Sequence, residues 1–209
     1  MTATPRPNTP RTKAAQREAT MAALITEGRR RFAHQGYADV GLADLVAAVG
    51  VTKGALYHHF GSKAGLFRAV VAQVQQEVAD RVSAAAEHHP DDPWRQLVAG
   101  CEAFLAASAD PDIQRIMLID APAVLGWHEW RAMDEAASGR LLVDVLTVLT
   151  GDGTLPAQPV PPLARLLSGA MNEAALWLAQ STGSADLAAT TAALRRLLAG
   201  LRTHAGDPS

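Results

Sequence analysis

The stretch Leu42–Phe60 constrains the fold more than any other part of this 209-residue chain. Its leucines and valines recur at helical spacing up to Val49, and Gly50 then offers a backbone that can take the left-handed angles typical of a helix end. Thr52 follows, and its hydroxyl can accept a hydrogen bond from a free backbone N–H of a second helix. The pattern predicts two short helices joined by a tight turn, a geometry that suits entry into a DNA major groove.

The second of these helices has a polar surface and is too short to add much core beyond Leu56. We expect Lys53 to reach guanine acceptors or a phosphate, and Tyr57 to offer its hydroxyl to a phosphate and its ring to thymine methyl groups. Of the neighbouring His58 and His59, we expect one to pack internally and the other to meet a phosphate. A metal site at this pair is the weaker alternative, because no Cys or acidic cluster lies at ligand spacing nearby.

A first helix is expected from about Thr12 to about His34. One face carries apolar and small residues at helical spacing: Met21, Leu24, Ile25, Gly28 and Phe32. The other face carries basic residues: Arg11, Lys13, Arg17, Arg29, Arg30 and Arg31. For Arg29–Arg31, contact with DNA phosphates and a solvated basic face remain equally open. Residues 1–10, rich in Pro and Thr, are predicted to form a disordered arm that carries Arg6.

A long helix is predicted from Lys63 to about Glu87, with Ser62 as its N-cap. Its valines and Phe67 fall at helical spacing, and roughly 25 residues would span about 37 Å. Such a helix would join the N-terminal part to the rest of the chain as one rod. Lys63 lies at its N-terminus, where free backbone N–H groups favour a phosphate.

The remaining chain is also predicted to be helical, since no segment alternates with period two over strand length. Cap-and-proline pairs and loop residues divide it into five helices. They are expected from Pro93 to about Ser108, from Pro111 to about Ile119, from Ala121 to about Thr150 with Gly126 and Gly139 as candidate bends, and roughly over Leu163–Gln180 and Ser184–Leu201. The fold class is therefore all-α, with about nine helices. We expect an arm over 1–10, a helix-turn-helix domain over 11–62 and a helical body over 63–209.

Charge and cysteine content restrict the class of protein. The net charge is −2, yet residues 1–63 hold nine Lys/Arg against four Asp/Glu, and the rest of the chain is acidic. A basic head on an acidic body indicates that one end meets phosphates. Cys101 stands alone, which excludes an intramolecular disulfide. Without a signal-peptide pattern or a membrane-length apolar run, the sequence predicts a cytoplasmic protein that does not enter a membrane.

The head resembles the helix-turn-helix signature of the tetracycline-repressor (TetR) family over roughly residues 12–67. The resemblance is carried by Gly36-Tyr37, Leu45, the run GVTKGALYHHF at 50–60, Ser62-Lys63 and Leu66-Phe67. It implies three N-terminal helices, a long fourth helix and a helical body that binds a ligand and dimerises. Residues 114–131 also resemble a stretch found in one subgroup of such regulators.

The resemblance implies DNA contacts by Thr52, Lys53, Gly54, Tyr57, His58 and Lys63, with Leu56 a weaker candidate that we assign to the core. Gly54 leaves room for the backbone to approach DNA. One departure from the family lies at Val40-Gly41, where family members usually carry Ser or Thr. The missing hydroxyl removes an N-cap and leaves a phosphate contact unsupported.

Two-fold pairing would place two recognition helices about 34–36 Å apart on a palindromic operator. The two closing helices offer apolar faces for a homodimer: Leu166, Leu167, Ala170, Ala174 and Trp177 on one, and Leu194, Leu197, Leu198 and Leu201 on the other. The alternative is that these faces are buried only within the monomer.

An effector pocket is expected in the body. Its candidate residues are aromatic, methionine and polar side chains: Phe104, Met117, Trp127, His128, Trp130, Met133, Met171, Asn172 and Trp177. Most such aromatics could equally be core, and Asn172 with Glu173 could form interface hydrogen bonds. Because no cationic cluster marks the body, a neutral, apolar or weakly cationic effector fits better than a phosphate or acyl-CoA.

The preferred hypothesis is a dimeric repressor released from DNA by a small-molecule effector, with repression implied by the resemblance alone. A DNA-binding regulator without an effector is the alternative. An all-helical enzyme has little support, because Cys101 lacks an identifiable His partner and no HExxH or phosphate-binding loop is present. We expect no cofactor and no metal.

Overall fold

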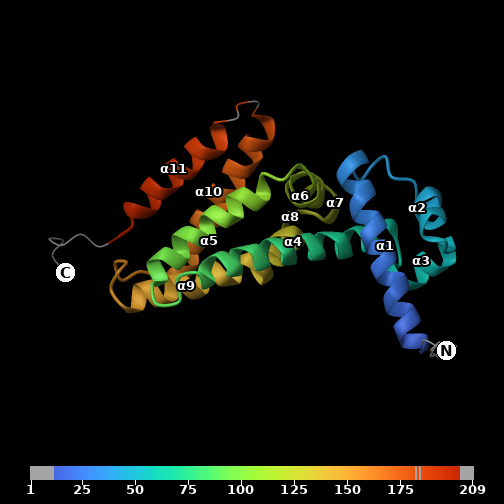
Figure 1. Ribbon diagram of the computed structural model, residues 1–209, viewed down its shortest axis with the longest axis horizontal. Coiled ribbons are helices and arrows are strands. Elements are labelled where there is room, and N and C mark those ends of the chain that lie inside the picture. The colour runs from blue at the N-terminus through green and yellow to red at the C-terminus, as the bar shows by residue number, and fades with distance from the viewer. Residues whose placement is uncertain (1–11, 182, 184, 203–209) are drawn as a thin grey trace, which may run out of the picture.

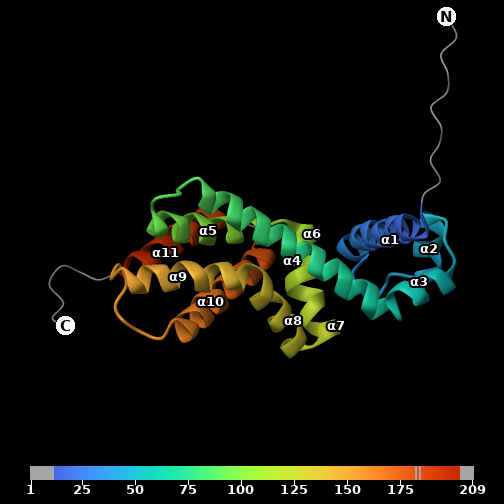
Figure 2. The same cartoon turned by 90° about the horizontal axis from the view of Figure 1, so that it is seen from below.

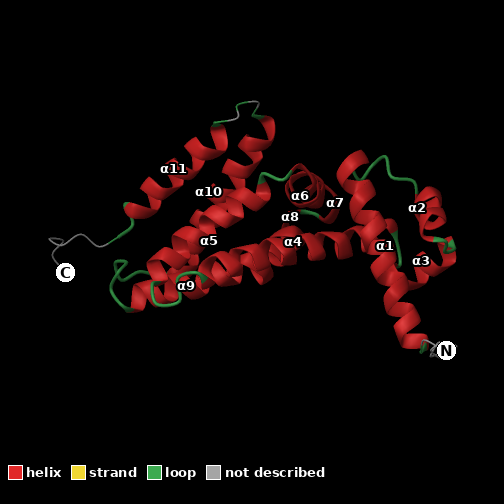
Figure 3. Ribbon diagram, in the orientation of Figure 1, coloured by secondary structure: helices red, strands yellow, loops and turns green. Residues whose placement is uncertain are grey.

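A computed structural model describes residues 12–181, 183 and 185–202, so the predicted arm over residues 1–10 lies outside the described part. Every regular element in the described residues is a helix (Figure 3), which confirms the all-α class. The elements are α1 (Lys13–Gln35), α2 (Leu42–Val49), α3 (Lys53–Phe60), α4 (Lys63–Glu87), α5 (Pro93–Ser108), α6 (Pro111–Gln114), η1 (Arg115–Asp120), α7 (Ala121–Leu125), α8 (Trp127–Asp134), η2 (Glu135–Gly139), α9 (Arg140–Gly151), α10 (Val160–Gln180) and α11 (Asp186–Ala199).

Helices α1, α2 and α3 pack around the N-terminal end of α4 and form the head (Figure 1). Leu24, Phe32 and Leu45 are fully buried there beside Phe67 of α4. The Phe32 and Phe67 rings meet edge to face at 5.0 Å between centroids. Each such side chain contributes about 1.5–3 kcal/mol of burial free energy. Leu56 of α3 is also fully buried, which confirms its assignment to the core.

Helix α4 runs from the head into the body (Figures 1 and 2). It starts at Lys63 as predicted, because Ser62 accepts a hydrogen bond from the Gly65 N–H at 2.9 Å, and it ends at Glu87, close to where the sequence predicted. Val70, Val74 and Val78 are buried along its length. One amphipathic helix therefore contributes to the cores of both the head and the body.

The chain from Pro111 to Leu125 departs from the prediction. A new helix was expected at Ala121-Pro122, but α6, η1 and α7 form one continuous run. Proline inside a helix lacks an N–H and crowds the preceding turn, and a local π-helical turn relieves the crowding. The π register shows in the Ala121 N–H, which donates to the carbonyl of Ile116, five residues earlier.

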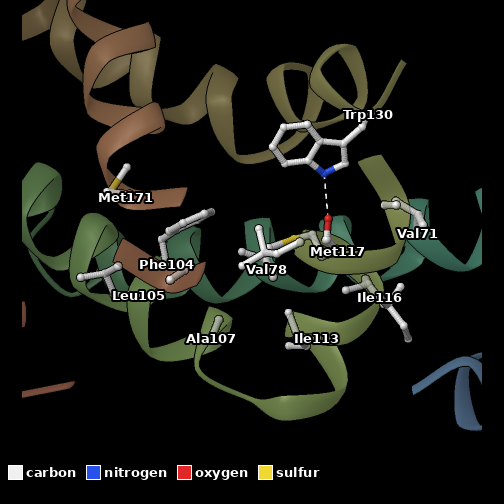
Figure 4. Close-up of a cluster of buried hydrophobic side chains, with 14 of the residues drawn as sticks. Val71, Val78, Phe104, Leu105, Ala107, Ile113, Ile116, Met117, Trp130 and Met171 are labelled. Atoms are coloured by element: carbon white, nitrogen blue, oxygen red, sulfur yellow. Dashed lines mark hydrogen bonds between the residues drawn. The ribbon is translucent and has the colours of Figure 1, made fainter. Parts of the chain in front are cut away.

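This π turn leaves one carbonyl without its helical partner. In the π register the Met117 carbonyl would pair with residue 122, which is a proline. The indole Nε1 of Trp130 donates to this oxygen at 2.8 Å, and the contact is buried (Figure 4). Trp130 is only 4% exposed, so its ring also fills the core between the two helical runs.

The predicted helix from Ala121 to Thr150 is likewise divided. It breaks at Gly126, and α8, η2 and α9 then form a second continuous run with a kink at Ala137, where φ is −96° and ψ is −108°. The bends expected at Gly126 and Gly139 thus mark real departures from a straight helix. Counted as continuous runs, the described residues form nine helices, the number predicted.

Replacing Trp130 by Phe should lower the free energy of unfolding by about 1–3 kcal/mol, because the buried Met117 carbonyl loses its donor. Urea denaturation followed by circular dichroism would measure the change. Trp127→Phe is the matched control, since Trp127 is 62% exposed and should change stability by less than about 0.5 kcal/mol. Equal effects of the two variants would contradict this role of the Trp130 indole.

Candidate nucleic-acid interface and effector cavity

The turn between α2 and α3 is built as the sequence predicts. Gly50 ends α2 with φ 74° and ψ 30°, a left-handed conformation that favours glycine. The Thr52 hydroxyl accepts a hydrogen bond from the Ala55 N–H at 3.2 Å and starts α3. Leu56 then fixes the inner face of α3 in the core, so the opposite face is held outward.

That outer face carries most of the predicted DNA contacts. Thr52, Lys53, Gly54 and His58 are exposed, and the Tyr57 side chain is 50% exposed although it is a large aromatic. An exposed tyrosine on a short, firmly anchored helix has a hydroxyl and a ring face available to a groove. The structure therefore brings five of the six predicted contact residues to one surface.

His58 and His59 differ in their surroundings. His58 is exposed, whereas His59 is half-buried and its Nδ1 has no hydrogen-bond partner among the described residues. Burial, with smaller contributions from His58 and Arg17, lowers the pKa of His59. His59 therefore packs partly against the head, and His58 is the more exposed of the two.

Lys63, the sixth predicted contact, lies against the protein surface. Its ammonium donates to the Ala38 carbonyl at 3.2 Å and sits 4.5 Å from the centre of the Tyr37 ring. Burial lowers the pKa of Lys63, while Asp39 acts in the opposite direction. The Lys63 side chain packs against the link between α1 and α2. To contact a phosphate, it would have to leave the Ala38 carbonyl and the Tyr37 ring.

The start of α2 lacks a side-chain cap, as expected from Gly41. Asp44 lies in the first turn, where its negative charge offsets part of the helix dipole. Gly41 therefore leaves backbone N–H groups of α2 without a hydroxyl partner.

The basic face of α1 is partly neutralised by ion pairs. Arg29 pairs with Glu77 of α4 at 2.5 Å, and Arg30 and Arg31 both pair with Glu27. The pKa of Glu27 falls to about 2, first because of its hydrogen bond with Arg30. The Arg29–Arg31 group thus forms contacts within the protein rather than a free basic face.

One hydrogen bond joins the backbone of the head to the body. The Tyr37 N–H donates to Oδ2 of Asp120, at the end of η1, at 2.8 Å, and Arg115 donates to the same oxygen at 3.3 Å. Gly36 permits this approach: its φ is +80°, and a Cβ there would lie 2.0 Å from a guanidinium nitrogen of Arg115. The link after α1 is therefore fitted closely to η1.

The body contains a cavity of about 290 Å³, just below the range of about 300–1,000 Å³ typical of small-molecule sites. It lies between α4, α5, η2, α9 and α10. Phe104 and Met171 line it, as predicted, together with Cys101 and Leu142. Burial, with a smaller contribution from Glu102, raises the pKa of the Cys101 thiol to about 12, so the thiol is neutral at ordinary pH.

The other predicted pocket residues do not line this cavity. Met117 and Trp130 are core residues joined by the hydrogen bond described above (Figure 4), and Asn172 is buried, with no hydrogen-bond partner for its Oδ1 among the described residues. Trp127 and His128 lie on the surface of α8, Trp177 is 51% exposed on α10, and Met133 is half-buried.

Sequence reasoning missed the small residues that line the cavity. Gly100 faces Val82, whose nearest side-chain atom would lie 3.3 Å from an added Cβ. Ser138 and Gly139 belong to η2, next to the kink at Ala137. The available signal was the pair of glycines at 100 and 139, on helices that would otherwise pack with larger side chains.

A short helix with exposed donors, capped and anchored on a long helix that enters a helical body, defines a helix-turn-helix DNA-binding regulator. Comparison with known families agrees. Residues 24–70 match the family described as bacterial regulatory proteins, tetR family, and residues 94–201 match the tetracyclin repressor-like C-terminal domain. The chain belongs to the TetR family of transcriptional regulators.

Individual relatives support the same placement. A TetR-family regulator from Pectobacterium atrosepticum is 38% identical, with a TM-score of 0.77, over 93% of this chain and 99% of that one. The transcriptional repressor AcnR of Corynebacterium efficiens is 31% identical over 119 residues, which is 56% of this chain and 62% of AcnR, less than two thirds of its length. RolR, solved with resorcinol, has a TM-score of 0.69 at 19% identity over 88% of this chain and 90% of RolR, a likeness of fold alone.

No helix in the described ranges has the length and apolar character needed to span a membrane. Within the same residues, no group of three or more His, Cys, Asp or Glu side chains is placed to hold a metal ion.

Proposed function

We propose that this regulator acts as a homodimeric repressor that binds a palindromic operator through α3 and is released by a small-molecule effector. The observation that carries the proposal is the outer face of α3, where Lys53, Tyr57 and His58 are exposed on a helix fixed by Leu56. Lysine and tyrosine donors on such a helix can reach base edges and phosphates.

Exposed apolar side chains on the two closing helices support pairing. Leu166 is 72% exposed and Trp177 is 51% exposed on α10, and Leu197 is 50% exposed on α11. Leu167, Leu194 and Leu198, also expected at the interface, are instead buried within the chain. Large apolar side chains left exposed on neighbouring helices are typical of an oligomer surface, and a second copy related by two-fold symmetry would cover them.

The cavity and the head–body contact support control by a ligand. The cavity lies beside the kink in η2, and η1 holds the Tyr37 backbone through Asp120. A ligand that binds one body conformation more tightly shifts the population toward it. The fold is shared with RolR, whose structure contains resorcinol, which favours a body of this architecture as an effector site.

Lys53→Ala or Tyr57→Ala should weaken operator binding by at least about 30-fold, because each dimer would lose the contact in both half-sites at roughly 1 kcal/mol or more each. The operator would come from selection in a random DNA pool, and affinity from gel shifts at fixed salt. Arg140→Ala, an exposed change in the body, is the control. Unchanged binding by both α3 variants, or a selected site without two-fold symmetry, would refute the proposed DNA reading.

The double variant Leu166→Glu/Leu197→Glu should sediment as a monomer, because pairing would bury four uncompensated carboxylates. Analytical ultracentrifugation would report the mass, and circular dichroism the helix content. Ile119→Glu, at an exposed apolar site outside α10 and α11, should leave the wild-type mass unchanged. A double variant that still dimerises would place the interface elsewhere.

Asp120→Ala should uncouple the ligand from DNA, since it removes the hydrogen bond from Tyr37 to η1. The test uses a compound that is found in a thermal-shift panel and that releases the wild-type protein from its operator. The dissociation constant of this compound from Asp120→Ala should stay within about twofold of the wild-type value. The ligand's effect on operator affinity should shrink from the roughly 5- to 150-fold typical of allosteric coupling toward none. Arg68→Ala, which breaks the exposed pair with Glu129, should retain the response. Full release in Asp120→Ala would exclude this route.

A further inference from the structure

The ionisable groups in the cavity wall are few and of one kind. Among the described residues that line it, none is a lysine, arginine or histidine. The ionisable side chains present are Cys101 and Asp144. Because the Cys101 thiol stays neutral, Asp144 is the charged group of the wall.

The cavity runs from the interior to the surface. Leu97, Cys101 and Phe104 are between 2% and 5% exposed and form its inner end. Val148 is 51% exposed and Asp144 is also exposed, so these two residues of α9 lie at the mouth. An elongated ligand would therefore place one end among apolar side chains and the other beside a carboxylate.

Most polar groups of the wall are already paired within the protein. The Ser168 hydroxyl accepts from Arg131 at 2.9 Å, and the Gln96 amide donates to the His89 carbonyl at 2.9 Å. Arg131 itself pairs with the buried Asp134 and does not line the cavity. Among the described residues that line the cavity, the half-buried Ser138 hydroxyl is a polar group without such a partner. The wall thus offers a buried negative charge no cation and little more than one free hydroxyl.

We propose that the cavity binds uncharged or cationic amphiphiles and rejects anionic ones, with the polar head of the ligand at Asp144 and its apolar tail against Cys101 and Phe104. A carboxylate has no favourable orientation in this site. Placed inside, it meets no cation and loses its hydration. Placed at the mouth, it lies beside a like charge. The inference rests on the proposed function of the cavity as the effector site.

The test compares three ligands that share one tail: 1-decanol, decylamine and decanoate, at pH 7.5 and low salt. Isothermal titration of the purified full chain should show binding of the alcohol and the amine, with decanoate at least about tenfold weaker. The amine should exceed the alcohol by up to about fivefold, the range of an exposed ion pair. Decanoate that binds as tightly as decanol would overturn the selectivity.

Variants at the mouth assign the selectivity to Asp144. Asp144→Asn should remove the advantage of decylamine and leave decanol unchanged, and Asp144→Lys should bring decanoate to within about twofold of decanol. Asp80→Lys makes the same charge change at an exposed residue outside the cavity and should alter none of the three affinities. Ala86→Phe, which fills the cavity, should abolish binding of all three. A decanoate affinity unmoved by Asp144→Lys would overturn the role of Asp144.

Operator binding by the same samples separates the two proposals. If the wild-type chain shifts its operator but none of the three amphiphiles binds, the ligand class is wrong and the DNA-binding regulator stands. If the chain binds no operator while decanol and decylamine bind as expected, the proposed repressor function fails and the selectivity of the cavity stands.

Discussion

The structure depends on one amphipathic helix that belongs to two cores at once. Leu66, Phe67 and Val70 of α4 are fully buried in the head, and Val74 and Val78 continue the same buried stripe into the body. Because interiors are close-packed, neither end of α4 can shift without moving side chains that other helices hold. The head is therefore oriented by the body, although α1, α2 and α3 make most of its surface.

A second connection constrains the head independently of α4. The segment η1 carries Asp120 against the Tyr37 N–H at one end, and the carbonyl of Met117 within it receives the Trp130 indole from α8. The π turn that makes room for Pro122 thus has two consequences: it frees an acceptor for α8 and positions a carboxylate for the head. Since α8 continues through the kinked η2 into α9, this path joins a cavity-lining segment to the head through buried or half-buried contacts.

Local chemistry explains which features could be predicted from the sequence. Helix starts set by an N-cap were predicted to the residue, as for Lys63 after Ser62 and Pro93 after Asp92, because a cap and its partner lie three residues apart. The exposure of Tyr57 followed from the burial of Leu56 on the same short helix. The continuous helical run from Pro111 to Leu125 was not predicted, because a proline such as Pro122 normally signals a helix start. The Trp130 indole that pairs with the Met117 carbonyl of the π turn comes from a different helix, so local sequence gives no sign of it.

The cavity resisted prediction for a different reason. Aromatic and methionine content identifies side chains that bury area, whereas a cavity depends on where small residues leave space. The Trp130 indole donates to a carbonyl in the core and Trp127 is exposed to solvent, so neither of these tryptophans lines the cavity. Gly100 and Gly139 line the cavity, the latter beside the kink at Ala137, and whether small residues border a cavity depends on which helices face them.

Ion pairing also changes how the charge of the head should be read. Residues 1–63 carry a formal net charge of +5. Of their basic side chains, however, Arg29, Arg30 and Arg31 form ion pairs with Glu77 and Glu27. Affinity for DNA and its salt dependence follow the number of phosphates neutralised rather than net charge. We therefore expect the exposed Lys53 on α3 to contribute more to DNA affinity than Arg29, Arg30 and Arg31 on α1, because a cation already paired within the protein must break that pair before it can meet a phosphate.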